Sequence, residues 1–288
     1  MLTILAPAKI NLTLEVLAKR QDGFHEIRSV IQTINLCDSL RFQSSQSIEI
    51  KCDIPIWIPE ESLVSKTIKL LQETTGCSEG VTIKVDKRIP LMSGLGGDSS
   101  DAAATLRGLN EFWELGLSMG ELLELASRLG SDVAFFLYRD TALIEGRGER
   151  VTPLPPLPNM WVVLVVPAVP GMLGKTKHLY ASLKTSHYTD GQVTERLVES
   201  LWVGGEFTPS ALFNTFENVA FARFAGLNVY REHIVEIGAA DVHLVGSGPT
   251  LFTLVKDKAQ AEDLHIRCQQ QGLESYLTDI SAPMDSAE

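Results

Sequence analysis

A glycine-rich loop is the strongest chemical feature of this 288-residue sequence. We call it the phosphate loop, and it consists of Pro90, Leu91, Met92, Ser93, Gly94, Leu95, Gly96, Gly97, Asp98, Ser99 and Ser100. Glycine allows positive φ and close approach of the backbone to a ligand. The alanine-rich segment that follows predicts a helix, whose N-terminus offers unpaired N–H groups and a partial positive charge. The loop is therefore a candidate anion site, although a turn that only packs a strand against a helix would contain the same residues.

The start of that helix is predicted from its polar residues. Ser99 and Ser100 are residue types that cap helices, and Asp101 suits the first turn.

Two common phosphate-binding motifs are excluded. Gly174-Lys175-Thr176 resembles the end of a P-loop, but Val169 stands where that motif needs its first glycine. The phosphate loop is not a dinucleotide fingerprint, because Ser99 occupies the third glycine position.

Charged residues elsewhere could complete a catalytic site, and each also has an ordinary explanation. Lys9 and Asn11 share one face of an alternating segment, where position alone favours a solvated edge lysine. Asp132 opens a short apolar segment, where it could be a base near the interior or a capping carboxylate. Lys87 and Arg88 precede the phosphate loop, where they could meet an anion or be solvated turn residues.

The elements that position these residues follow from hydrophobic periodicity. Alternation over residues 10–16 predicts a strand with one buried face. A second strand runs to Leu36, and two short strands at about 40–43 and 47–51 suggest a meander. A helix follows from Ser62, a strand over 81–85 leads into the phosphate loop, and helices are expected over 102–113 and 118–129.

The prolines of residues 153–158 mark the predicted domain boundary. We expect an N-terminal domain over 1–154, a C-terminal domain over 159–280 and a flexible tail over 281–288. The apolar run 161–166 predicts a buried central strand. The second half has the order β-α…α-β-β-α-β, which indicates an α+β sheet with helices on one side.

Composition limits the class of partner. A hydrophobic content of 44% is typical of a globular protein, and the net charge of −11 argues against a nucleic-acid partner. Four unpaired cysteines suit a reducing compartment, and the six histidines lack metal-site spacing, so no protein-built metal site is expected. Prolines interrupt the uncharged stretch 151–174, and no signal peptide is visible. A cytoplasmic monomer or homodimer without a membrane partner is expected.

Three motifs together resemble the GHMP kinase family. They are Pro7-Ala8-Lys9-Ile10-Asn11-Leu12, the phosphate loop, and Gly246-Ser247-Gly248-Pro249-Thr250, in the family's order. Asp22-Gly23-Phe24-His25-Glu26 and Leu129-Gly130-Ser131-Asp132-Val133 narrow the resemblance to members that act on a cytidine-diphosphate-linked sugar alcohol of the non-mevalonate isoprenoid pathway. The resemblance implies a two-lobed α+β fold. Its active site would lie in the cleft between an N-terminal α/β domain and a ferredoxin-like C-terminal domain.

The resemblance also implies roles for individual residues. The phosphate loop would bind the phosphates of ATP, with Mg²⁺ carried by the nucleotide. Asp132 would be the catalytic base for the 2-hydroxyl of the sugar alcohol, and Lys9 its partner. Phe24 and His25 would hold the cytosine by stacking and hydrogen bonding, and Asn11 would contact the substrate. The helix near Ser62 would flank the adenine.

Some positions depart from the family pattern. Asp98 replaces a glycine, Val245 a serine or threonine, Thr215 an aspartate, Ser62 an adenine-contacting asparagine and Ala134 a proline. Asp98 places a negative charge beside the triphosphate, where it would point away or help to hold Mg²⁺. Two alternatives stay open: another small-alcohol kinase, such as a homoserine or mevalonate kinase, and an inactive nucleotide-binding regulator.

Overall fold

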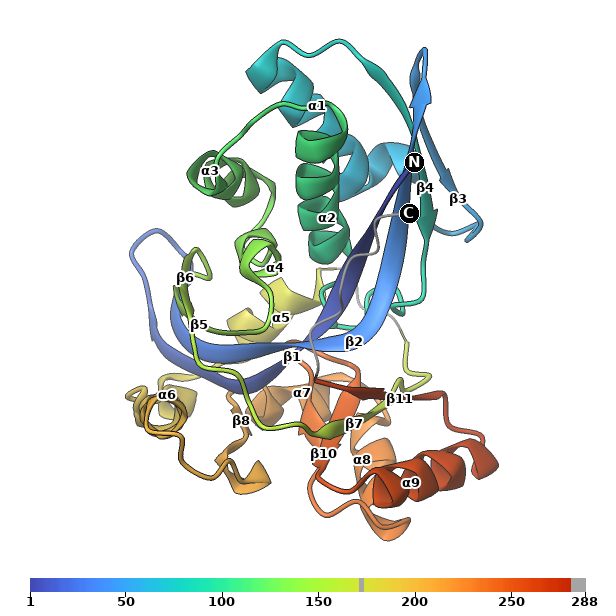
Figure 1. Ribbon diagram of the computed structural model, residues 1–288. Coiled ribbons are helices and arrows are strands. Elements are labelled where there is room, and N and C mark those ends of the chain that lie inside the picture. Colours follow the sequence, from blue (N-terminus) through green and yellow to red (C-terminus); the bar gives the residue numbers. More distant parts are fainter. Residues whose placement is uncertain (171–173, 281–288) are drawn as a thin grey trace.

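The computed structural model describes residues 1–170 and 174–280 and contains two β-sheets (Figure 1). The first sheet has the order β3-β4-β2-β1-β8, with β5 paired to β2 and β6 to β5. Its strands are β1 (Leu2–Lys19), β2 (His25–Ser45), β3 (Ile48–Cys52), β4 (Gly80–Asp86), β5 (Thr141–Gly146), β6 (Arg150–Pro153) and β8 (Phe213–Asn214). The predicted tail, 281–288, lies outside the described residues.

Helices from the first half of the chain cover one side of this sheet (Figure 1). They are η1 (Pro59–Glu61), α1 (Leu63–Thr75), α2 (Gly97–Phe112), α3 (Met119–Leu129) and α4 (Val133–Tyr138). Phe42 of β2, Leu106 of α2 and Phe135 of α4 belong to the same buried cluster. A Cβ at Gly108 would lie 2.3 Å from the Phe42 ring, so α2 lies directly against β2.

The second sheet has the order β11-β7-β10-β9 and confirms the α+β prediction for the second half. Its strands are β7 (Trp161–Val165), β9 (His243–Leu244), β10 (Leu251–Val255) and β11 (Ser275–Asp279). The apolar β7 is an inner strand, as predicted. The accompanying helices are α5 (Lys175–Ser182), η2 (Thr185–His187), α6 (Gln192–Trp202), η3 (Pro209–Ala211), α7 (Glu217–Arg223), α8 (Leu227–Glu236) and α9 (Lys258–Gln270).

Strand β1 corrects one prediction, because both of its faces are buried. Thr13 and Glu15, on the polar face, are no more exposed than the apolar Leu14 between them. Helix α6 covers this face: the Thr194 N–H donates to Glu15 Oε2 at 2.7 Å, and its hydroxyl donates to Thr13 Oγ1 at 2.9 Å. The expectation of one buried face was wrong because periodicity shows which face is apolar and not what covers the other.

The predicted meander is also wrong. Residues 40–43 belong to the long strand β2, and β3 pairs in parallel with β4 instead of forming a hairpin with its neighbour.

The chain passes from the first sheet to the second between Pro153 and Trp161, near the predicted domain boundary. However, β8 pairs in parallel with β1, and one buried cluster contains both Leu12 and Leu164. The division into two domains stays a prediction. Among the described residues, no helix is long and apolar enough to cross a membrane.

Candidate active site

The phosphate loop ends in a helix N-terminus, but the cap differs from the prediction. Helix α2 begins at Gly97 and is capped by Gly96, whose φ of 80° lies in the left-handed region. Ser99 and Ser100 therefore lie inside the helix, and the Ser100 N–H donates to Gly96 O at 2.9 Å. A Cβ at Gly96 would lie 2.8 Å from the Phe136 ring. Glycine takes the cap because it satisfies both the positive φ and the close packing.

Backbone hydrogen bonds fasten the loop to both halves of the fold. The Lys9 N–H donates to Leu95 O at 2.9 Å, which joins the loop to β1. The Thr250 N–H donates to Ser93 O at 3.3 Å, which joins it to the turn after β9. Inside the loop, the Ser93 hydroxyl donates to Pro90 O at 2.7 Å. The loop is therefore held in shape before any ligand binds.

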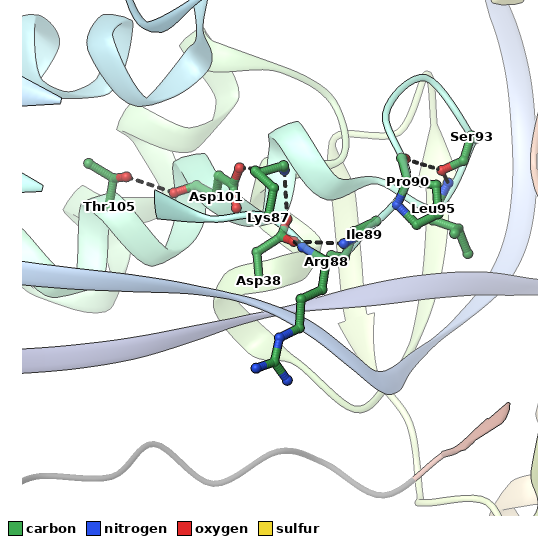
Figure 2. Close-up of polar contacts among 9 residues, drawn as sticks. All are labelled: Asp38, Lys87, Arg88, Ile89, Pro90, Ser93, Leu95, Asp101 and Thr105. Carbon is green, nitrogen blue, oxygen red and sulfur yellow. Dashed lines mark hydrogen bonds and ion pairs between the residues drawn. The ribbon is translucent and has the colours of Figure 1, made fainter. Parts of the chain in front are cut away.

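A buried charge network brackets the loop (Figure 2). Lys87 Nζ lies 2.6 Å from Asp38 Oδ2 and 2.7 Å from Asp101 Oδ2, and all three side chains are at most 1% exposed. Asp38 Oδ1 also accepts the N–H groups of Arg88 and Ile89, at 2.6 and 2.8 Å. The network joins the residues before the loop to helix α2 after it. The solvated alternative for Lys87 is wrong.

The network also shifts the titration of its members. Burial raises the pKa of Asp101 well above its ordinary value, against the opposing effect of Lys87. Burial alone would lower the pKa of Lys87, but Asp101 and Asp38 raise it. Lys87 is thus held as a cation beneath the loop. One oxygen of Asp101, Oδ1, is buried and has no hydrogen-bond partner among the residues that the structure describes.

One cavity of about 960 Å³ brings most of the predicted site residues together. Lys9, Asn11, Phe24, His25 and Asp132 line it. So does the phosphate loop, except Leu95 and Ser100, whose side chains are buried and do not line it. Residues that are distant in the sequence therefore share one site large enough for a nucleotide and a second ligand.

Lys9 is buried in this cavity rather than solvated at an edge. It is 4% exposed, and its Nζ donates to Asn11 Oδ1 at 2.8 Å. The Asn11 amide donates in turn to Ser29 Oγ at 3.0 Å, which orients both side chains. Burial lowers the pKa of Lys9, and the negative charge of Asp132 opposes that shift. Lys9 and Asp132 are therefore electrostatically coupled.

Asp132 occupies the N-cap position of α4, but its side chain makes no capping hydrogen bond. The capping explanation is therefore wrong for its carboxylate, which lines the cavity. The same charge acts on Tyr180, whose pKa is raised by burial and by Asp132. A carboxylate that shares a cavity with a buried lysine and the phosphate loop can accept a proton from a hydroxyl bound there.

An aromatic group in the same cavity was only partly predicted. The His25 ring stacks on Tyr180 with centroids 4.6 Å apart, and Tyr188 meets it edge-on at 6.1 Å. Phe24 is 52% exposed, with the Arg147 guanidinium 4.9 Å from its ring centroid. Burial lowers the pKa of His25, assisted by the charge of Lys19, which favours the neutral imidazole.

Sequence reasoning missed Tyr180, Tyr188 and Arg147. These three residues lie more than one hundred positions after Phe24 and His25 in the sequence, and no sequence motif links them to that pair. Ser62 caps α1, because its hydroxyl oxygen accepts a hydrogen bond from the Ser65 N–H at 3.2 Å. Ser62 is not among the described residues that line the cavity. The prediction that the helix near Ser62 flanks the adenine stays a prediction.

Comparison with known proteins identifies the family of this chain. The model of the GHMP kinases N terminal domain matches residues 62–140. A 4-diphosphocytidyl-2-C-methyl-D-erythritol kinase of Dehalococcoides mccartyi is 49% identical over 99% of this chain and 100% of its own length. The chain belongs to this kinase family. A Listeria welshimeri member is 38% identical over 97% of this chain and 94% of its own.

Solved structures agree with that membership. A crystal structure of 4-(cytidine 5'-diphospho)-2C-methyl-D-erythritol kinase matches with a TM-score of 0.82 and 30% identity, covering 98% of this chain and 100% of that one. A homoserine kinase from Cytophaga hutchinsonii shares the fold, with a TM-score of 0.72 and 20% identity over 97% of this chain and 94% of its own. The predicted GHMP kinase fold is confirmed, and the chain is a kinase of this family.

Proposed function

We propose that this protein transfers the γ-phosphoryl group of ATP to the 2-hydroxyl of 4-diphosphocytidyl-2-C-methyl-D-erythritol, releasing ADP. One observation carries the proposal. A single cavity combines a phosphate loop, a coupled lysine–carboxylate pair and an aromatic group able to hold a pyrimidine. The relatives that bear this substrate's name match over the whole length of the chain.

Asp132 is the general base in this proposal. Its carboxylate accepts the proton of the 2-hydroxyl as that oxygen bonds to the γ-phosphorus. The bond from the γ-phosphorus to the oxygen bridging it to the β-phosphate breaks at the same time, and its electron pair leaves on ADP. Proton transfer of this kind contributes about 10²–10⁴-fold to rate. The absence of a capping hydrogen bond leaves this carboxylate available for the proton.

Lys9 attracts the Asp132 carboxylate and offsets negative charge on the transferring phosphoryl group. Its buried position strengthens both effects, because few water molecules screen the charges. Asn11 holds the ammonium group in place through the 2.8 Å hydrogen bond. Backbone N–H groups at the start of α2 and the helix dipole stabilise the phosphates. Phosphoryl transfer depends mainly on such positioning and charge stabilisation.

His25 and its aromatic neighbours give the proposed selectivity for cytosine. A neutral imidazole has one donor and one acceptor nitrogen, which suits the hydrogen-bonding edge of a pyrimidine. Phe24 is exposed enough for its ring to stack on a base. A homoserine or mevalonate kinase has no pyrimidine to hold, so this group favours the cytidine-linked substrate over those alternatives.

The residues present also fit a nucleotide-bound Mg²⁺. Asp98 and Ser99 lie in the first turn of α2 and line the cavity, and both offer the oxygen ligands that Mg²⁺ prefers. When bound, Mg²⁺ would neutralise charge on the β- and γ-phosphates. Asp98 would thereby help to hold the metal rather than only repel the triphosphate. Among the described residues, no cluster of three histidine, cysteine or acidic side chains forms a separate metal site.

The test is turnover by the purified protein with Mg²⁺ and ATP. We expect ADP release with 4-diphosphocytidyl-2-C-methyl-D-erythritol, and a product that carries the new phosphate on the 2-oxygen by NMR. Homoserine and mevalonate serve as competing acceptors. Turnover of homoserine without turnover of the cytidine-linked substrate would refute the proposed specificity. Nucleotide binding without any turnover would favour an inactive regulator.

A further inference from the structure

We propose that Lys175 is a positioning residue of this active site. It fastens the phosphate loop to the turn of residues 246–250 and places a second ammonium group near Lys9 for the phosphates of ATP. The inference rests on the proposed function only in taking ATP as the ligand. It gives a role to Gly174-Lys175-Thr176, which is not a P-loop and which no part of the proposed mechanism uses.

The phosphate loop and the turn meet backbone against backbone. A Cβ at Gly94 would lie 2.7 Å from Val245 O and 3.0 Å from Gly248 O, so no larger residue fits between them. The φ of Gly94 is 94°, which also favours glycine. Together with the hydrogen bond from Thr250 N–H to Ser93 O, this contact closes one wall of the cavity.

Lys175 bridges the two segments at this junction. Its Nζ donates to Met92 O at 2.6 Å and also to Gly248 O. The neighbouring hydroxyls of Thr176 and Ser247 are hydrogen-bonded at 2.8 Å, which draws the start of α5 against the same turn. Met92 has a φ of 53°, a strained value for a residue with a side chain. A hydrogen bond to its carbonyl group opposes relaxation of that peptide.

Lys175 and Lys9 approach the same turn. A Cβ at Gly246 would lie 2.9 Å from Lys9 Nζ, while Lys175 donates to Gly248, two residues later. Both lysines line the cavity. Burial, assisted by the positive charge of Lys9, lowers the pKa of Lys175 to about 8. Two cations that repel each other in the empty site are stabilised together when a triphosphate binds near them.

Three variants test the role in nucleotide binding. Lys175→Met removes the ammonium group and keeps an unbranched chain, Lys175→Arg keeps the charge, and Lys69→Met is the control. Lys69 is an exposed lysine on α1, and it pairs only weakly with Glu73, at 3.8 Å. Isothermal titration with Mg²⁺ and a non-hydrolysable ATP analogue measures Kd, and thermal unfolding without nucleotide measures Tm.

For Lys175→Met we expect Kd for the analogue to rise about tenfold to a hundredfold, as for loss of a charged hydrogen bond. Lys175→Arg should recover part of that affinity, and Lys69→Met should bind like the wild type. KM for ATP should follow Kd, whereas KM for the acceptor alcohol should change less than about twofold. A Kd equal to that of the wild type, with only a lower Tm, would show a purely structural role and overturn the inference.

A measurement on the wild-type protein covers the case in which Lys175→Met does not fold. Lysines are acylated with a water-soluble ester at pH 8 and mapped by mass spectrometry, with and without the Mg²⁺-bound analogue. We expect the nucleotide to suppress labelling of Lys175 several-fold and to leave Lys69 unchanged. Equal labelling of Lys175 in both samples overturns the inference. Normal nucleotide protection without turnover of the cytidine-linked substrate would refute only the proposed function.

Discussion

Lys87 Nζ lies 2.7 Å from the carboxylate of Asp101, and both side chains are buried beneath the phosphate loop. The second carboxylate on Lys87, that of Asp38, completes a network that contains one cation and two acids. A buried pair of this kind is costly to break, because the remaining charge has neither water nor a partner. The network therefore links the stability of the fold to the shape of the loop.

The first prediction follows from this network. Lys87→Met should lower the free energy of unfolding by about 3–5 kcal/mol, because two buried carboxylates lose their cation. Lys84→Met, on β4 three residues before Lys87, is the matched control, since its 3.2 Å ion pair with Asp53 is at the surface and is worth about 0–1 kcal/mol. Urea unfolding measures both variants. Equal losses would show that the buried network does not stabilise the fold.

The second prediction concerns the proposed base. Asp132→Asn should lower kcat by about 10²–10⁴-fold, since an amide cannot accept the hydroxyl proton. ATP affinity should change little, because the phosphate loop is intact. Steady-state kinetics and nucleotide titration measure the two effects separately, with the exposed Asp241→Asn as the control. Turnover near the wild-type rate would remove Asp132 from the mechanism.

The third prediction compares two glycines at helix N-caps. Gly96 and Gly226 have φ values of 80° and 84°, so alanine is strained at both. A Cβ at Gly96 would meet the Phe136 ring at 2.8 Å, whereas no atom of the described residues lies within 4 Å of one at Gly226. Gly96→Ala should raise KM for ATP about tenfold or more, because the loop must move. Gly226→Ala should cost about 1 kcal/mol of stability and leave KM unchanged. Similar KM values for both would contradict the prediction.

The fourth prediction concerns pH. Burial places the pKa of His25 below its ordinary value of 6.5, so most of the imidazole is neutral in the folded protein at pH 6.5 and above. KM for the cytidine-linked substrate should be constant above that pH and rise only as the pH falls through the lowered pKa. Protonation replaces the acceptor nitrogen with a second donor.

The control for this profile is His265. Burial also lowers its pKa, but His265 is not among the described residues that line the cavity. His265→Gln should keep the wild-type profile, whereas His25→Gln should flatten it and raise KM at every pH. A rise in the wild-type KM that begins well above pH 6.5 would show that a different group controls binding.

Local features of the sequence determined the phosphate loop and most elements. Glycine spacing, the alternation in β1 and the apolar run of β7 each depend on neighbouring residues, so the chain shows them directly. Family motifs identified Lys9, Asn11, Phe24, His25 and Asp132, and the structure places all five in one cavity. Their catalytic and binding roles stay predictions until the variants are measured.

The tertiary structure decided what covers each polar residue. Lys9 is buried, although its position in a strand suggested solvent, because two distant segments pack against it. A Cβ at Gly96 of the phosphate loop would lie 3.2 Å from Lys9 Cγ, and one at Gly246 would lie 2.9 Å from Lys9 Nζ. Lys87 is neutralised by Asp38 and Asp101, two residues that no sequence pattern connects with it. Tyr180 and Lys175 reach the site on α5 from beyond the proline-rich segment. Burial and charge pairing depend on contacts between distant segments, and local periodicity carries no record of those contacts.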